Sequence, residues 1–407
     1  MLRFNMKFIN SNSFKYFYLN TIFNSIGAGI FEVLFSLYLI SLGYNGSFVG
    51  LTYSVGTISL GLLSIPVGFI SEKIGKKNSF IISRIISLVS LILLLLINNR
   101  ISILINISLF NISQVFYLIS AAPFIADIVS DENRVTVSSF VFSSSLFAVT
   151  LGNLIGGFLP FFIIKLFTAQ INNSLSLRLS LLLYPLFLIF SLIFIMQIKS
   201  RSKSMNEDKL ISLHSNRINL KNLSFLKNVK QIIIASVIVS FGVAFILPFF
   251  PIYFKLRFNA STQLIGLLFS LSNIPLAFAT LLSGRIVRRL GMGKGIGICH
   301  LIGAPFTLLI GFPFNLSIIS SSFVMRKILM NLYIPIWDNF FINRVNPENR
   351  GTALAINNFA ISITGCIGAV LGGIFYTNNL LVYPFIIAAI SVFIASLIYW
   401  NIKSIKY

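Results

Sequence analysis

Long apolar runs separated by short polar stretches dominate the sequence. Each run holds about 20 residues, which matches a helix that spans the hydrocarbon core of a bilayer. Strands of a membrane barrel would be about half as long and would alternate apolar with polar positions. The pattern therefore predicts an all-α membrane protein with about twelve transmembrane helices, near residues 17–40, 48–71, 79–98, 101–125, 136–164, 177–197, 230–254, 263–284, 295–313, 317–341, 352–376 and 381–401.

The composition agrees with a protein that is surrounded by lipid. Of the 407 residues, 56% are hydrophobic and only 10% are charged, whereas soluble domains are about a quarter charged. The first apolar run is too long for the core of a signal peptide, so we expect it to remain as the first helix. We expect a lipid bilayer to surround the chain.

The net charge of +22 could attract nucleic acid, but the positions of the cations argue against that partner. Most of them lie in alternate loops between the apolar runs, on the side that holds both termini. By the positive-inside rule this predicts a multi-pass protein of the plasma membrane with cytoplasmic N- and C-termini. The loops of the other side carry only Arg100, Lys165, Arg178, Lys255 and Arg257.

The second half of the chain repeats features of the first at one constant offset. A shift of 216 positions maps Gly50 onto Gly266 and Tyr117 onto Tyr333. One ungapped register across six spans predicts two homologous six-helix bundles, residues 1–198 and 230–407, joined by a basic cytoplasmic linker at 199–229. The same shift maps Gly68 onto Gly284, Gly75 onto Gly291, Glu132-Asn133-Arg134 onto Glu348-Asn349-Arg350, and Gly152, Gly156 and Gly157 onto Gly368, Gly372 and Gly373.

The connection between the second and third spans carries a recognisable motif. It reads Gly68-Phe-Ile-Ser-Glu72-Lys73-Ile-Gly75-Lys76-Lys77, and it resembles the signature loop of the major facilitator superfamily. With the duplication and the span count, the resemblance covers the whole chain. It implies the superfamily's fold of two pseudo-twofold-related bundles, which transport a small solute by alternating access. It also implies that Glu72, Lys73 and Lys77 bridge to neighbouring helices and help to hold the outward-facing state.

The second half keeps an incomplete copy of this loop, with Gly284, Arg288, Arg289 and Gly291 at the equivalent positions. Because Arg288 stands where the first half has Glu72, we expect most of the gating charge to lie in the first-half loop. The repeated glycine motifs, Gly152, Gly156 and Gly157 in span five and Gly368, Gly372 and Gly373 in span eleven, predict close helix packing. They also resemble a motif that is most prominent in the exporters of the superfamily.

Among the nine acidic residues, only Glu32 is predicted well inside a span. An ionised side chain at a helix centre costs about 2.5–3.5 kcal/mol on insertion scales, so it needs a partner, water or a proton. Arg326 and Lys327 lie in span ten at a similar depth. The resemblance implies that spans one, four, seven and ten line a central cavity, and the predicted cavity residues are Thr21, Ser25, Glu32, Gln114, Tyr117, Arg326, Lys327, Tyr333 and Trp337.

Two interpretations of Glu32 stay open. It is either a site that binds and releases a coupling proton, influenced by Arg326, or one half of a structural ion pair. The favoured function is a secondary active antiporter that exports small amphipathic compounds in exchange for protons. A permease that takes up an organic anion or a sugar, favoured by Arg326 and Lys327, is the main alternative, and a receptor that does not transport is a third.

An enzyme is not expected, because no nucleophile lies beside a general base in any recognisable pattern. Cys299, Cys366, His214 and His300 have neither the spacing of metal ligands nor that of a disulfide framework. We therefore predict a monomeric transport protein or permease with no cofactor and no metal.

Overall fold

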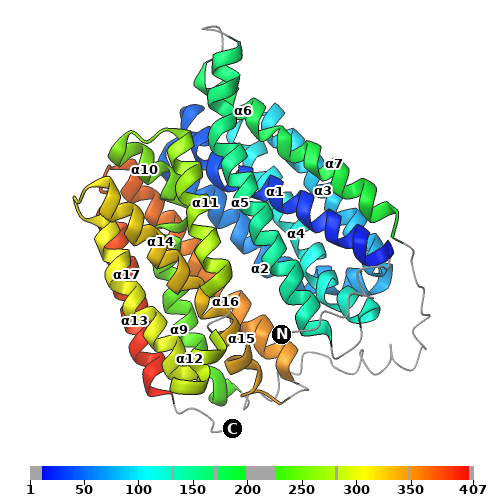
Figure 1. Ribbon diagram of the computed structural model, residues 1–407, viewed down its shortest axis with the longest axis vertical. Helices are drawn as coiled ribbons and strands as arrows, with labels where there is room; N and C mark the ends of the chain where they lie inside the picture. Colours follow the sequence, from blue (N-terminus) through cyan, green and yellow to red (C-terminus); the bar gives the residue numbers. More distant parts are fainter. Residues whose placement is uncertain are drawn as a thin grey trace.

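The computed structural model describes residues 12–129, 133–167, 172–198, 226–279, 283–346 and 349–402. Throughout these ranges the regular elements are helices, and no strand occurs. Figure 1 shows the helices of the first half on the right, coloured blue to green, and those of the second half on the left, coloured green to red. The all-α prediction is therefore confirmed for the described part of the chain.

Helices of the first half begin mainly at asparagine caps. The side chains of Asn45, Asn99 and Asn172 each accept a hydrogen bond from a backbone N–H three residues on, which satisfies one otherwise unpaired donor of the first turn. Span six is interrupted at Leu182, where Pro185 cannot donate the helical hydrogen bond. The helices are α1 (Asn12–Ser41), α2 (Gly46–Ile74), α3 (Lys76–Leu96), α4 (Arg100–Ile128), α5 (Arg134–Leu166), α6 (Asn173–Leu181) and α7 (Leu183–Met196).

Helices of the second half follow the same order but are more often broken. The predicted spans seven and ten each divide into shorter helices, and α9 begins inside the predicted linker, most of which lies outside the described residues. The elements are α9 (Leu226–Ala244), the 3₁₀ turn η4 (Leu247–Phe249), α10 (Phe250–Phe258), α11 (Thr262–Ala279), α12 (Ser283–Leu290), α13 (Met292–Gly311), α14 (Leu316–Leu332), α15 (Ile334–Ile342), α16 (Arg350–Thr377) and α17 (Tyr383–Asn401).

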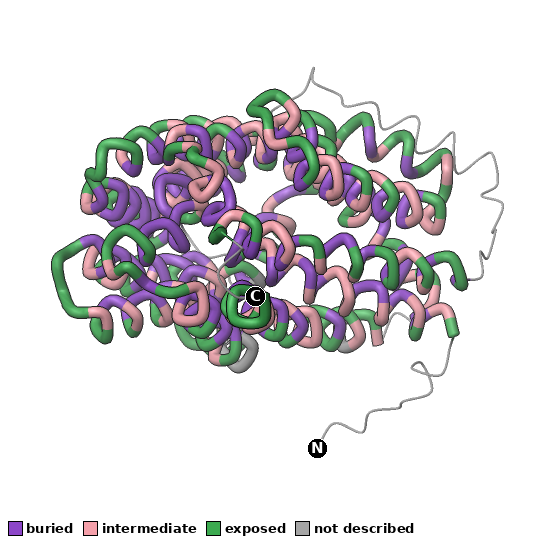
Figure 2. Tube along the Cα trace, turned by 90° about the horizontal axis from the view of Figure 1, so that it is seen from above, coloured by how far each residue is buried: buried purple, intermediate pink, exposed green. Residues whose placement is uncertain are grey.

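Ten helical segments of the described chain are long and apolar enough to cross a membrane. Predicted spans eight and ten are not among them: the part of span eight whose side chains the structure describes covers Thr262–Leu276, and span ten divides into α14 and α15. Large apolar side chains cover the outside of the bundle. Leu166 and Ile101 are 77% and 72% exposed, and in Figure 2 the exposed positions follow the outer sides of the helices. Such a surface is stable against lipid but not against water.

The contacts between the halves occur in pairs whose residues are related by the offset of 216 positions. The Ser54 hydroxyl donates to the Cys366 carbonyl at 2.8 Å, and the equivalent Ser270 hydroxyl donates to the Thr150 carbonyl at 3.0 Å. The first bond joins α2 to α16 and the second joins α11 to α5. A duplicated chain folded as two bundles about a pseudo-twofold axis produces this exchange of partners.

The glycine contacts repeat the same exchange. A Cβ on Gly266 would lie 2.7 Å from the Cα of Gly157, and a Cβ on Gly50 would lie 3.3 Å from the Cα of the equivalent Gly373. Only glycine allows the backbones to approach this closely. We call the end of the molecule where α1 meets α2 the Gly46 end, and the opposite end, where α2 meets α3, the Gly75 end.

Candidate functional site

A cavity of about 940 Å³ lies between the two halves. Side chains of α1, α2 and α4 line it from the first half, and side chains of α9, α14, α15 and α16 line most of it from the second. The volume falls at the upper end of the usual range for small-molecule sites. The site can therefore hold a solute of drug-like size that touches both halves.

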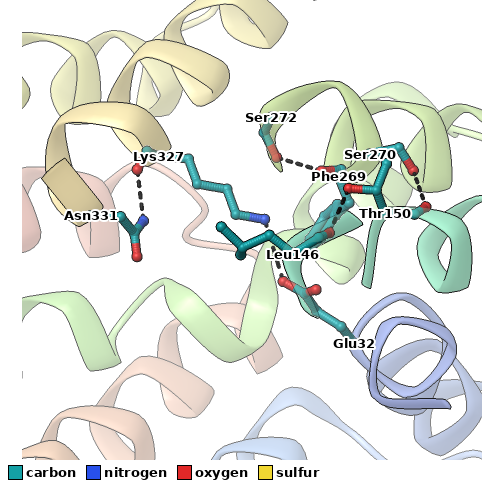
Figure 3. Close-up of polar contacts among 8 residues, drawn as sticks. All are labelled: Glu32, Leu146, Thr150, Phe269, Ser270, Ser272, Lys327 and Asn331. Atoms are coloured by element: carbon teal, nitrogen blue, oxygen red, sulfur yellow. Dashed lines mark hydrogen bonds and ion pairs between the residues drawn. The ribbon is translucent and has the colours of Figure 1, made fainter. Parts of the chain in front are cut away.

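One ion pair crosses this cavity. Lys327 Nζ of α14 lies 3.5 Å from Glu32 Oε1 of α1, as Figure 3 shows. The Glu32 side chain is 38% exposed and that of Lys327 is 17% exposed. The Lys327 ammonium also lies 5.2 Å from the centre of the Phe269 ring. The pair thus connects the two halves at a point that a solute or water in the cavity can reach.

Arg326, which the sequence interpretation placed opposite Glu32, has different surroundings. It is only 3% exposed, yet it lines the cavity. Its guanidinium carbon lies 5.2 Å from the centre of the Phe250 ring, and its Nε has no hydrogen-bond acceptor among the described residues. Neighbouring helical residues point about 100° apart, so Lys327 and Arg326 cannot approach Glu32 equally.

The second half supplies a wall of aromatic and hydroxyl groups. Trp337 Nε1 lies 3.1 Å from both the Ser236 hydroxyl and the Tyr399 hydroxyl, and all three residues line the cavity with Tyr333. The fully buried His300 lies behind this wall, with its ring 4.4 Å from that of Tyr333. Its Nδ1 lies 3.0 Å from the Ile296 carbonyl, while its Nε2 has no partner in the described chain.

Four predicted cavity residues lie elsewhere. The Thr21 and Tyr117 hydroxyls are 2.8 Å apart inside the first half, and Ser25 is buried. Gln114 Nε2 lies 3.3 Å from the Ser87 hydroxyl between α3 and α4. None of the four is among the residues that line the cavity. Of the predicted set, the cavity brings together Glu32, Arg326, Lys327, Tyr333 and Trp337.

Sequence reasoning missed several residues that line the cavity. The helical spacing from Glu32 could have indicated Phe35, which lies three positions on along α1. The aromatic residues of other helices gave no comparable signal, because phenylalanine is common in every span. The missed lining residues include Phe31, Phe35, Tyr53, Phe110, Ser236, Phe250, Phe269, Phe323, Asn357, Asn358 and Tyr399.

The loop at the Gly75 end makes its contacts within the first half. Lys76 forms an ion pair with Asp127 of α4, and its ammonium also donates to the Pro123 carbonyl at 3.0 Å. Gly75 has a φ of 81°, and the equivalent Gly291 has a φ of 77°, which explains glycine at both positions. The gating role of Glu72, Lys73, Lys77, Arg288 and Arg289 stays a prediction.

Within each of the two glycine motifs, neighbouring glycines contact different helices. Gly156 lies against α1 within its own half, where an added Cβ would be 3.0 Å from the Ile30 Cα. Gly157, the next residue, faces Gly266 of the other half at 2.9 Å. In span eleven, Gly372 packs on Phe245, the residue that follows α9, whereas Gly373 contacts Gly46 across the interface. Each motif thus joins a helix to its own bundle and also to the other bundle.

The glycine contacts between the halves weaken toward the Gly75 end. On α2, Gly46, Gly50 and Gly61 all lie against α16, whereas Gly68 would meet only Ile119 of its own half, at 3.8 Å. A Cβ on Gly284 would meet no described atom within 4 Å. Among the described glycines, the close contacts between the halves are therefore those of the Gly46 end and not those of Gly68 and Gly284.

Comparisons with known proteins agree with this architecture. The sequence model of the Major Facilitator Superfamily matches residues 17–228 and 232–404, which is nearly the whole chain. No curated relative matches the chain in sequence.

Similar solved structures include three transporters. A D-xylose–proton symporter superposes with a TM-score of 0.75 at 16% identity, over 98% of this chain and 100% of its own. The nucleoside transporter NupG gives 0.73 at 14% identity, over 96% and 98%. An inward-facing, unoccupied bacterial homolog of the human lysosomal transporter Spinster gives 0.70 at 15% identity, over 95% of each chain. At these identities the likeness shows the fold.

Proposed function

This chain belongs to the major facilitator superfamily, and from that premise we propose that it exports small amphipathic compounds in exchange for protons. The proposal makes it a secondary active antiporter of the plasma membrane. Glu32 is its proton-coupling residue, and the cavity between the halves is the binding site. The observation that carries the proposal is the Glu32–Lys327 ion pair, which crosses the cavity and joins the two halves.

The proposed cycle follows from what protonation does to this pair. An ionised Glu32 attracts Lys327, and the attraction favours the arrangement in which the Gly46 end is closed. A solute bound from the Gly75 end, which the positive-inside rule predicts to be cytoplasmic, competes for Lys327 and breaks the pair, so the halves can separate at the Gly46 end and release the solute there. Glu32 then takes up a proton from the Gly46 side, and the protonated carrier returns the cavity to the Gly75 end. Departure of the proton at the Gly75 end restores the pair, so solute and proton have moved in opposite directions.

The test uses the chain reconstituted in vesicles with an imposed pH gradient and a panel of fluorescent amphipathic compounds of negative, zero and positive charge. The wild type should drive at least one of them against its gradient. Glu32→Gln should abolish proton-driven accumulation and retain downhill exchange, because the cavity remains. Glu32→Asp, which keeps a titratable carboxyl group, should restore part of the coupling. Unchanged proton-driven transport by Glu32→Gln would falsify the role of Glu32.

Uptake of an organic anion or a sugar is the second candidate, and Arg326 in the cavity lining favours it. The same vesicles distinguish the two directions. In an exporter, solute and proton move in opposite directions, whereas in a symporter both move together. Binding without any flux would instead indicate a receptor.

A further inference from the structure

Arg326 is a buried cation in the wall of the cavity without a matching acid. The side chain is 3% exposed and lines the cavity, and its Nε finds no acceptor among the described residues. An ionised group removed from water is stable only when a counter-charge or hydrogen bonds replace its hydration. The guanidinium therefore needs an acceptor from the contents of the cavity.

The acids that line the cavity do not supply this acceptor. Glu32 is engaged with Lys327, the neighbour of Arg326 on α14. Asp338 also lines the cavity, but it lies in α15, beyond the end of α14, and among the described residues no ion pair joins it to Arg326. Around Arg326 the lining thus contains two cations and one acid, which leaves one positive charge unbalanced.

The surroundings of this charge are aromatic. The Arg326 guanidinium lies against the Phe250 ring, and Phe250 packs on Phe323 with a ring separation of 4.8 Å. Phe269 lies 5.3 Å from Phe323 on the other side. All three phenylalanines line the cavity. An unbalanced guanidinium beside an apolar wall is complementary to a molecule that joins an oxyanion to an aromatic body.

We propose that Arg326 is an anion-binding subsite and that the transported compounds are small aromatic anions. The carboxylate or another oxyanion accepts hydrogen bonds from the guanidinium, and the aromatic body lies on Phe250, Phe269 and Phe323. Arginine suits this role because its planar donors match the two oxygens of a carboxylate. This inference rests on the proposed transport function and names the chemical class of its substrate.

The division between the two neighbouring cations follows from their contacts. Lys327 has its acid in the protein, so its charge is available to the proton-dependent ion pair. Arg326 has none, so its charge is available to the solute. A single helical turn of α14 therefore serves both the coupling ion and the substrate, and the two effects can be separated by substitution.

The test is equilibrium binding to the purified full-length chain in detergent, measured by calorimetry. The probes are 2-naphthoate, the neutral 2-naphthamide and the cationic 2-naphthylmethylammonium, which share one aromatic body. The wild type should bind the naphthoate at least tenfold more tightly than the amide. Arg326→Gln should remove this preference, and Arg326→Lys should keep part of it. Arg257→Gln removes an exposed cation of α10 outside the cavity and should keep all of it.

Several results would overturn the inference. They are equal binding of acid and amide by the wild type, no binding of the naphthoate, tighter binding of the ammonium compound, or an unchanged preference in Arg326→Gln. Binding of dihexanoyl phosphatidylglycerol with no naphthoate binding would assign the site to a lipid head group and would also overturn it. If Arg326→Gln does not fold, the acid-to-amide ratio of the wild type and of Arg326→Lys still decides the question.

This readout is independent of transport. Binding is measured without a membrane or a proton gradient, so it does not depend on whether Glu32 couples transport to protons. Naphthoate binding that depends on Arg326, without flux in vesicles, would refute the proposed export and leave the anion subsite standing. Proton-driven flux of a neutral or cationic compound, with no preference for the naphthoate in binding, would refute the anion subsite and leave the proposed export standing.

Discussion

The two halves place a basic side chain against a tyrosine at equivalent positions, but only one of these pairs supports the cavity. In the first half the Arg84 guanidinium lies 4.5 Å from the centre of the Tyr117 ring. In the second half, 216 positions later, the His300 ring lies 4.4 Å from the Tyr333 ring. Tyr333 lines the cavity, whereas Tyr117 is bonded to Thr21 inside its own bundle.

The comparison shows that the duplicated backbone does not dictate equivalent roles. Both halves use the same register for the contacts that join them, as the bonds of Ser54 and Ser270 show. The ion pair in the cavity instead takes Glu32 from the first half and Lys327 from the second, and Arg326 also comes from the second. A site at a pseudo-twofold interface can therefore be strongly asymmetric although its scaffold is not.

The largest expected effect comes from the glycines that join the halves. Gly157→Val and Gly266→Val should each destabilise the closed Gly46 end by about 3 kcal/mol or more, because added carbons meet backbone atoms that cannot move aside. Spin-label distances across the Gly46 end should lengthen, and the melting temperature should fall. Gly50→Val, at the position equivalent to Gly266, should have the same effect. Gly284→Val should change neither the spin-label distance nor the melting temperature. A harmless Gly266→Val would contradict the close contact.

An intermediate effect is expected from the buried basic residues. Arg84 is fully buried, and although its Nε donates to Asn20 Oδ1 at 2.8 Å, both of its Nη atoms lack an acceptor among the described residues. Arg84→Met keeps most of the volume and removes the charge, so it should stabilise the protein by about 1–3 kcal/mol. His300→Met should change stability by less than about 1 kcal/mol, because a neutral imidazole is less costly to bury.

Thermal melting of the purified variants measures this difference between the halves. Affinity for the naphthoate probe gives the second readout, since Arg84 lies away from the cavity and His300 supports Tyr333. We expect only His300→Met to alter that affinity. A lower melting temperature for Arg84→Met would mean that the guanidinium stabilises the first half through contacts beyond those described.

The smallest effect tests the symmetry directly. Ser54→Ala and Ser270→Ala each remove one hydroxyl bond between the halves and should each cost about 1 kcal/mol. The two losses should be equal within about 0.5 kcal/mol and should add in the double variant, because the sites are well separated. Melting curves of the three proteins provide the comparison. Clearly unequal losses of stability in the two single variants would show that the two hydrogen bonds do not contribute equally to the interface.

Much of the fold could be read from the sequence because lipid imposes a simple rule. Each crossing needs a long apolar helix, so the spans appear as runs, and the runs coincide with the helices. The breaks in spans six, seven and ten were not predicted. They depend on local hydrogen bonding and packing rather than on apolar content, so hydropathy alone does not report them.

The candidate site could be predicted only in part. Glu32 and the pair Arg326-Lys327 were visible as rare charges within apolar runs, and all three line the cavity. Thr21 and Ser25 share a polar stripe of α1 with Glu32, yet both are buried in the first half and do not line the cavity. A stripe shows which residues share a face but does not say where along the helix that face leaves the bundle.

The sequence by itself determined the helical class, the duplication and the positions of the rare charges within the apolar runs, because these depend on composition and spacing along one chain. Only the tertiary structure decided that Lys327 and not Arg326 meets Glu32, and that Gly157 and not Gly156 crosses between the halves. In both cases adjacent residues have different partners. The rotation of a helix about its axis is set by its packing against all of its neighbours, and a single sequence does not state that angle.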